Sequence, residues 1–168
     1  YSSAASDVYK RQELSLMNAS EPYRVLFVCL GNICRSPAAE IIFKKMVKEQ
    51  GLESLIESDS AGMIGYHRGC PPDARMLAAL EKYGYADPGI KSRPVRKDDL
   101  EQFDLIVGMD RENLRALKQL DKNGQWEGKI VPMCFFTTRF LDEEVPDPYY
   151  GGQEGFEHVV ELLEDGCF

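Results

Sequence analysis

Short apolar runs typical of strands alternate along this chain with longer segments of helical periodicity. The runs are rich in β-branched and large apolar residues, and they cover residues 24–29, 55–62, 103–110 and 128–133. Each is followed by a segment whose apolar residues recur every three or four positions, at 36–51, 71–84, 111–120 and 154–165. This alternation predicts a parallel sheet with helices on both faces and functional loops at the carboxyl ends of the strands.

The length of the chain suits one domain. With 168 residues, no internal repeat and no low-complexity linker, we expect a single α/β domain on a four-stranded, twisted parallel sheet. Residues 1–16 are polar, aperiodic and without the apolar core of a signal peptide, so we expect a non-native or disordered leader there. The domain should then cover 17–168, with a C-terminus truncated while the apolar face of the last helix is still running.

Charge and cysteine usage narrow the choice of partners. The net charge is −8, and no apolar run reaches the roughly 18 residues that a membrane span requires. We therefore expect a soluble protein that binds neither nucleic acid nor membranes, so that any anion is held by a local site. Five cysteines, without paired zinc spacing, favour free thiols in a reducing cytoplasm over a disulfide framework or a metal site.

The stretch VCLGNICRSP, residues 28–37, lies between the first strand and the first helix and predicts a phosphate-binding loop. Backbone N–H groups of such a turn converge on one point, where the helix dipole adds positive potential. Gly31 and Asn32 are expected to adopt the positive φ that a tight anion-binding turn requires. The planar guanidinium of Arg35 can bind two phosphate oxygens at once.

The same loop predicts a reactive thiol at Cys29. A helix N-terminus and a cationic neighbour stabilise a thiolate, and the Ser36 hydroxyl is placed to donate to it. A nucleotide P-loop would require a lysine after the glycine, and a dithiol redox motif would require Cys-x-x-Cys. A structural buried cysteine is disfavoured by the combination Cys-x5-Arg-Ser. The pattern therefore favours Cys29 as a nucleophile within a phosphate-binding loop.

Three segments together resemble the low-molecular-weight protein tyrosine phosphatases. They are VLFVCLGNICRSPAAE near the start, DSAG after the second strand and DPYYGG near the end, and the resemblance runs from about Arg24 to the last helix. It implies a four-stranded parallel sheet flanked by helices and an enzyme without cofactor or metal. The implied partners are phosphotyrosine proteins as substrates and inorganic phosphate or other oxyanions in the active site.

By this resemblance Cys29 attacks phosphorus and becomes a cysteinyl-phosphate, while Arg35 binds the equatorial oxygens. Asp147 protonates the leaving phenolate and then activates water, a role that contributes roughly 10²–10⁴-fold. Alone, the segment PDPYYGG would be typical of a bare turn. The other implied residues form the phosphate-binding loop, its support and the substrate slot: Leu30, Gly31, Asn32, Ile33, Cys34 and Ser36, then Ser60, then Tyr66, Tyr149 and Tyr150.

Several positions depart from the family pattern or have two interpretations. Ile90 stands where many members carry a histidine, so one support of the loop is absent or replaced. Asp110 either lines the site or only caps the following helix. Cys34 is either a redox partner that traps oxidised Cys29 as a disulfide or a small buried residue. No site role is expected for the two histidines and the other three cysteines: His67, His158, Cys70, Cys134 and Cys167.

Three other activities remain as alternatives to aryl phosphate hydrolysis. Phosphoarginine phosphatases tend to carry threonine at the position of Ile33. Arsenate reductases on this fold require two further, closely spaced cysteines after the third strand, and residues 108–128 contain none. A catalytically silent phosphotyrosine-binding module would not require Asp147. Hydrolysis of phosphotyrosine and other aryl phosphate monoesters is therefore the favoured prediction.

Overall fold

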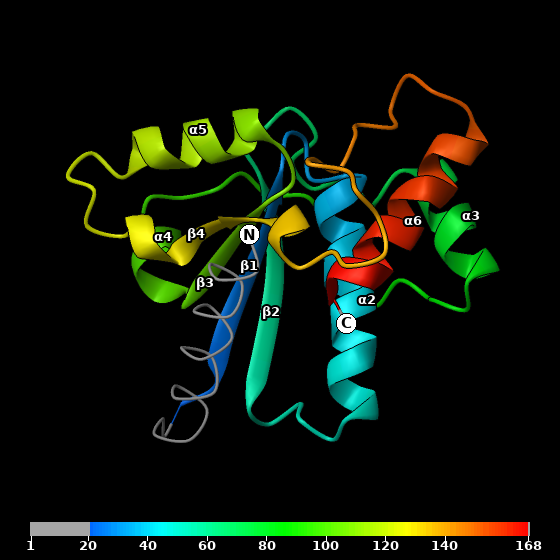
Figure 1. Ribbon diagram of the computed structural model, residues 1–168, viewed down its shortest axis with the longest axis horizontal. Helices are drawn as coiled ribbons and strands as arrows, with labels where there is room; N and C mark the ends of the chain where they lie inside the picture. The colour runs from blue at the N-terminus through cyan, green and yellow to red at the C-terminus, as the bar shows by residue number, and fades with distance from the viewer. Residues whose placement is uncertain (1–20, 168) are drawn as a thin grey trace.

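A computed structural model of the chain describes residues 21–167 (Figure 1). The leader predicted over residues 1–16 lies outside this range, as does Phe168. The predicted sheet is confirmed: four parallel strands pair in the order β2-β1-β3-β4. The bounds of the strands are β1 Tyr23–Cys29, β2 Ile56–Gly62, β3 Leu105–Gly108 and β4 Ile130–Pro132.

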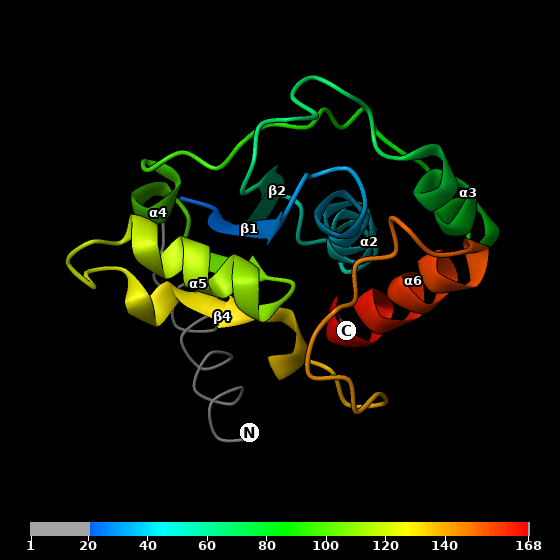
Figure 2. The same ribbon diagram turned by 90° about the horizontal axis from the view of Figure 1, so that it is seen from above.

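Helices cover both faces of the sheet, as Figure 2 shows from above. One face packs against α2 and α6, with α3 lying outside against α6, and the other face packs against α4 and α5. The bounds of these helices are α2 Arg35–Glu49, α3 Ala74–Lys82, α4 Asp99–Gln102, α5 Arg111–Leu120 and α6 Gln153–Cys167. Two short 3-10 turns, Glu127–Lys129 and Met133–Phe135, flank β4.

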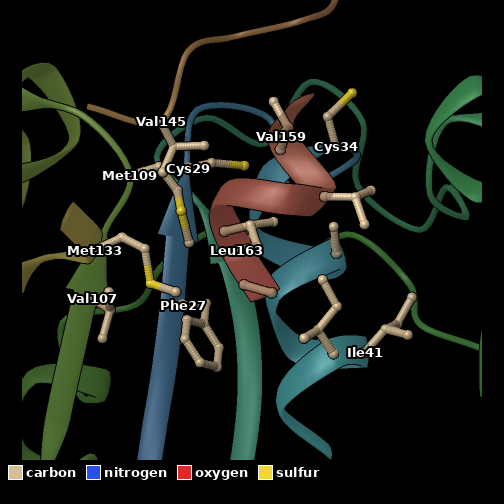
Figure 3. Close-up of a cluster of buried hydrophobic side chains, with 14 of the residues drawn as sticks. Phe27, Cys29, Cys34, Ile41, Val107, Met109, Met133, Val145, Val159 and Leu163 are labelled. Carbon is tan, nitrogen blue, oxygen red and sulfur yellow. The ribbon is translucent and has the colours of Figure 1, made fainter. Parts of the chain in front are cut away.

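The central strand β1 is buried from both sides, as its continuous apolar run predicts. Val25 and Phe27 belong to the core beneath α2 and α6, whereas Leu26 and Val28 belong to the core beneath α4 and α5. Each such side chain contributes roughly 1.5–3 kcal/mol when it is fully buried. Figure 3 shows Phe27 in the first core, below Cys29. Packing on both faces therefore fixes the strand that ends in Cys29.

Helix α2 begins six residues after the end of β1, so the segment between them forms a short loop at the carboxyl edge of the sheet. Pro37 lies in the first turn, where a missing backbone N–H costs no helical hydrogen bond. Gly51 has φ +68°, the left-handed conformation expected just beyond a helix C-terminus. The start and stop signals in the sequence thus place α2 correctly.

Some elements differ from the sequence prediction. Strand β3 occupies only Leu105–Gly108, because pairing with β1 is confined to those residues. The four-residue helix α4 was not predicted. Its buried Asp99 accepts hydrogen bonds from the Arg93 side chain and the Arg96 backbone, contacts that leave no periodic signal. Within residues 21–167 no helix is both long and apolar enough to cross a membrane.

Candidate active site

Three loops meet at the carboxyl edge of the sheet and enclose a cavity of about 340 Å³. They follow β1, β2 and β4, and they lie together at one end of the sheet in Figure 1. The lining residues come from the phosphate-binding loop, from the β2–α3 loop and from the β4–α6 loop: Cys29, Leu30, Gly31, Ile33, Cys34 and Arg35, then Ile64, Tyr66 and His67, then Asp147, Tyr149 and Tyr150.

The thiol of Cys29 lies at the floor of this cavity and contacts the Ser36 hydroxyl, with Sγ and Oγ 3.0 Å apart. Asn32 Nδ2 donates to Ser36 Oγ at 2.8 Å, and Ser36 Oγ is 3.3 Å from the carbonyl oxygen of Ala61. Ser36 has a single proton to donate, and its oxygen already accepts from Asn32. It can therefore turn its proton from Ala61 to an ionised Cys29, as the sequence predicts.

Asn32 adopts the predicted positive φ, at 58°, and its Oδ1 accepts a hydrogen bond from the backbone N–H of Arg93 at 3.0 Å. The same prediction is wrong for Gly31, which does not have a positive φ. A Cβ atom on Gly31 would lie 3.0 Å from Cδ2 of His67. Gly31 therefore provides space beneath the His67 ring rather than an unusual backbone conformation.

The end of β2 supports the loop from the side. A Cβ atom on Gly62 would lie 2.8 Å from the carbonyl oxygen of Leu30, so only glycine permits this approach. Ser60 lies beneath, where its hydroxyl donates to Glu40 of α2 at 2.6 Å. Burial raises the pKa of Glu40 above its usual range, although hydrogen bonds from Lys44 and Ser60 oppose the shift. Ser60 thus joins β2 to α2, the helix that continues from the loop.

Arg35 is buried and held from behind. Its Nη1 donates to Asp110 Oδ2 at 2.6 Å and to the carbonyl oxygen of Val145 at 3.0 Å. Burial disfavours the charged guanidinium, but Cys29 and Asp110 outweigh that cost and raise the pKa of Arg35. A charged, oriented guanidinium in the cavity wall suits an oxyanion ligand.

Asp110 caps α5 and also holds Arg35, but it is not among the residues that line the cavity. Its Oδ1 accepts from the backbone N–H of Asn113 at 2.8 Å, and the Asn113 side chain accepts from the Asp110 N–H, which forms a capping box on α5. Its other oxygen holds Arg35. The N-cap of α5 therefore also orients the arginine of the site.

Asp147 lies across the cavity from the loop. Its Oδ1 accepts from the backbone N–H of Tyr149 at 3.1 Å, and its Oδ2 is 3.8 Å from Nη2 of Arg35. The carboxylate is partly exposed, so it can exchange protons with solvent. The structure thus brings Cys29, Arg35 and Asp147 into one cavity from separate parts of the chain.

The three tyrosines of the predicted slot occupy different depths. Tyr149 is half-buried and packs against the guanidinium of Arg75, 5.2 Å from its ring centre. Tyr66 and Tyr150 are 84% and 95% exposed and lie at the mouth. Tyr149 is therefore the wall of the slot, while Tyr66 and Tyr150 form its rim.

Cys34 lines the same cavity but is buried, and burial raises its pKa to about 12. Figure 3 shows the sulfur of Cys34 turned away from that of Cys29. The two thiols are free in this structure. Both interpretations of Cys34 therefore remain compatible with its position.

Two residues that support the loop, Ser92 and Arg93, were not predicted. Ile90, which stands at the expected histidine position, packs against the core. The Ser92 hydroxyl instead donates to the carbonyl oxygen of Gly31 at 3.0 Å, beside the Arg93–Asn32 contact. These contacts join residues 61 positions apart, so no local sequence pattern predicts them. Ser92 and Arg93 thus supply the support that Ile90 cannot.

His67 was also missed, because an isolated histidine resembles a surface residue. Its ring lies 4.9 Å from that of Tyr66 and 6.3 Å from that of Tyr149, and it borders the cavity. His158 instead contacts Asp142 at 3.2 Å. The remaining cysteines, none of which lines the cavity, are exposed, buried and half-buried respectively: Cys70, Cys134 and Cys167. In residues 21–167 no group of three or more His, Cys, Asp or Glu side chains could hold a metal ion.

Comparison with known proteins supports one assignment. A family model described as low molecular weight phosphotyrosine protein phosphatase matches residues 24–168. The chain is 51% identical over 144 residues to a Synechocystis protein named for the same family, covering 86% of this chain and 91% of that protein. It is 42% identical over 145 residues to the low molecular weight protein-tyrosine-phosphatase YfkJ of Bacillus subtilis, covering 85% of this chain and 90% of that protein.

Solved structures agree with this result. A protein tyrosine phosphatase from Entamoeba histolytica, crystallised with Hepes in its active site, has a TM-score of 0.83 and 44% identity to the chain. The alignment covers 86% of this chain and 92% of that one. The resemblance in the sequence is therefore confirmed, and the chain belongs to the low molecular weight phosphotyrosine protein phosphatase family.

Proposed function

We propose that this member of the family hydrolyses phosphotyrosine in proteins, and other aryl phosphate monoesters, through a cysteinyl-phosphate at Cys29. The observation that carries the proposal is the meeting of Cys29, Arg35 and Asp147 in one cavity. Such a cavity holds a nucleophile, an oxyanion-binding guanidinium and a proton donor within reach of one phosphate group. A reducing cytoplasm suits this chemistry, because it keeps the thiol free.

In the first step the phosphate group enters the loop at the N-terminus of α2, where the guanidinium of Arg35 can bind its oxygens. The Cys34 side chain forms no capping hydrogen bond at that terminus, and helix N-termini favour anions. Cys29 attacks phosphorus as a thiolate while the bond to the phenolic oxygen breaks. Asp147 gives its proton to that oxygen, so a neutral phenol leaves.

In the second step Asp147 accepts a proton from water, whose oxygen attacks phosphorus. The sulfur–phosphorus bond breaks, and the thiolate and inorganic phosphate are released. Ser36 supports this departure because its hydroxyl can donate to the sulfur as charge returns to it. The cycle uses only water and side chains of this chain.

Substrate preference follows from the shape of the entrance. Phosphorus lies farther from the backbone in phosphotyrosine than in phosphoserine, and an aromatic wall at Tyr149 suits the phenyl ring. Beyond the wall the rim is apolar and exposed, with Leu30 and Ile64 beside the two outer tyrosines. Inorganic phosphate and other oxyanions should occupy the same floor. A relative from Entamoeba histolytica, solved as a product-state mimic, supports this part of the proposal.

The test is a panel of substrates with the wild-type protein. We expect release of phosphate from a phosphotyrosine peptide, competitive inhibition by inorganic phosphate, and little turnover of the matched phosphoserine and phosphoarginine peptides. Faster release from the phosphoarginine peptide, or arsenate reduction, would favour an alternative on the same fold. Tight binding of the phosphotyrosine peptide without turnover would reveal a binding module.

A further inference from the structure

The N-terminus of α5 contacts the loop that carries Asp147. The backbone N–H of Arg111, the first residue of α5, donates to Glu144 Oε2 at 2.6 Å. The guanidinium of Arg111 lies 4.0 Å from the other oxygen of Glu144 and forms an ion pair with Glu143. Glu144 therefore supplies a second carboxylate to the helix end that Asp110 already caps.

Val145, the next residue, is clamped on both sides of its backbone. Its N–H donates to the carbonyl oxygen of Met109 at 2.8 Å, and its own carbonyl accepts from Arg35 at 3.0 Å. Its side chain is 0% exposed and lies near Met109 and Cys29 in Figure 3. Asp147 follows two residues later. The position of Asp147 thus depends on a short segment fixed between α5 and Arg35.

We propose that Glu144 is a positioning residue for the reaction. By accepting from the first N–H of α5, its carboxylate holds Val145 against Arg35 and keeps Asp147 in the cavity. The inference rests on the proposed function, because it assigns Asp147 the role of the acid. It adds a residue that does not line the cavity and that the sequence does not single out.

The neighbouring glutamates differ in what they contact. Glu143 is 71% exposed and pairs with a guanidinium that is itself 66% exposed, and such ion pairs contribute little. Glu144 is 38% exposed and accepts from a backbone N–H at a helix N-terminus, where the helix dipole strengthens the bond. Glu143 is therefore a matched control with the same side chain one position away.

The experiment compares Glu144→Ala, Glu144→Gln and Glu143→Ala with the wild type on phenyl phosphate and para-nitrophenyl phosphate. We expect Glu144→Ala to lower kcat for phenyl phosphate about tenfold, part of the roughly 10²–10⁴-fold that a general acid supplies. The loss should be smaller for para-nitrophenyl phosphate, because its leaving group needs the proton less. Glu144→Gln should recover much of the rate since its amide oxygen can still accept from Arg111. Glu143→Ala should match the wild type.

A double-mutant cycle shows whether Glu144 acts through Asp147. In an Asp147→Asn background there is no acid to position, so Glu144→Ala should cost at most about twofold. An equal cost in both backgrounds would overturn the inference, as would equal effects of Glu143→Ala and Glu144→Ala. Thermal melting of each variant separates these outcomes from loss of folding.

Hydrogen exchange gives a readout independent of turnover. The Val145 amide should exchange faster in Glu144→Ala than in Glu143→Ala, because its bond to Met109 opens more often. Equal exchange in the two variants would contradict the positioning role even if the wild type proved inactive. Absence of wild-type turnover on every phosphate ester would instead contradict the proposed function.

Discussion

At the scale of single residues, Ser36 connects the phosphate-binding loop to Cys29, because its single hydroxyl proton can be donated to the Cys29 sulfur. Ser36 accepts from Asn32 and has two possible acceptors, the Cys29 sulfur and the Ala61 carbonyl. The left-handed backbone of Asn32, at φ 58°, brings its amide to Ser36. Asn32 therefore acts on the chemistry through Ser36, although its own side chain does not line the cavity.

Substitution of Asp147 tests its role as the leaving-group acid. Asp147→Ala should reduce turnover of para-nitrophenyl phosphate strongly and that of phosphotyrosine more strongly still, within the roughly 10²–10⁴-fold range of general acids. The poorer leaving group depends more on the proton. The measurement is kcat for both substrates in wild type and variant. Equal losses on the two substrates would rule out Asp147 as the leaving-group acid.

Cys34 gives a second prediction about single residues. Peroxide should inactivate the enzyme through a Cys29–Cys34 disulfide, and a dithiol reductant should restore activity, whereas Cys34→Ser should keep its turnover but lose most of its recovery. Because burial raises the pKa of Cys34 to about 12, its thiolate fraction, and with it the share of recoverable enzyme, should increase as pH rises towards that value.

Activity after peroxide and reductant, with peptide mass mapping, checks this prediction. Cys70→Ser is the control, because Cys70 is exposed and outside the cavity. Bound phosphate should protect the wild type by filling the site. Full recovery in Cys34→Ser, or a disulfide from Cys29 to Cys134, would contradict the pairing.

At the scale of elements, the end of α6 anchors the beginning of the β4–α6 loop. Asp165 is buried and accepts from the backbone N–H groups of Thr138, Arg139 and Phe140 at 2.9, 2.8 and 3.3 Å. Burial opposes the charge of Asp165, but these hydrogen bonds outweigh it and lower its pKa. A loop that must present Asp147 is thus tied to a helix well before that residue.

Asp165→Asn should therefore lower the free energy of unfolding by about 2 kcal/mol at neutral pH, since it replaces charge-assisted hydrogen bonds. A lowered carboxyl pKa contributes stability that is complete above the ordinary value of about 4 and is lost as pH falls through the folded-state pKa. Denaturant unfolding between neutral pH and pH of about 3 should show this loss in the wild type and a smaller one in the variant.

Thr138→Ala is the matched control, because it removes the Oγ1 contact to Asp165 and leaves the backbone donors in place. It should retain the acid-dependent loss of stability. A wild type and an Asp165→Asn variant with parallel pH profiles would show that the carboxylate does not stabilise the loop.

At the scale of the whole molecule, the parallel sheet explains why distant segments share one cavity. Parallel strands end at the same edge, so the loops after β1, β2 and β4 converge there (Figure 1). Cys29 and Asp147 are separated by most of the chain, and only the fold brings them together. Alternation of buried runs with helical periodicity was sufficient to predict this architecture.

Contacts between segments that are distant in the chain could not be predicted from the sequence. Periodicity located β1 and α2, and turn chemistry anticipated the backbone of Asn32 but not that of Gly31, where a neighbouring ring decides. Ser92 and Glu144 were missed because each acts through a backbone atom far along the chain. Hydrogen bonds to backbone groups place few demands on local sequence, so such residues resemble ordinary polar surface positions.

The proposed reaction depends on a covalent phosphate on the Cys29 sulfur. The most direct measurement is acid quenching of the enzyme during turnover of a labelled aryl phosphate, followed by peptide mapping. We expect label on the peptide that contains Cys29, at a higher level in Asp147→Ala when para-nitrophenyl phosphate is used, because loss of the base slows hydrolysis of the intermediate. Cys29→Ser should carry none. Label on another residue, or full turnover in Cys29→Ser, would contradict a cysteinyl-phosphate at Cys29.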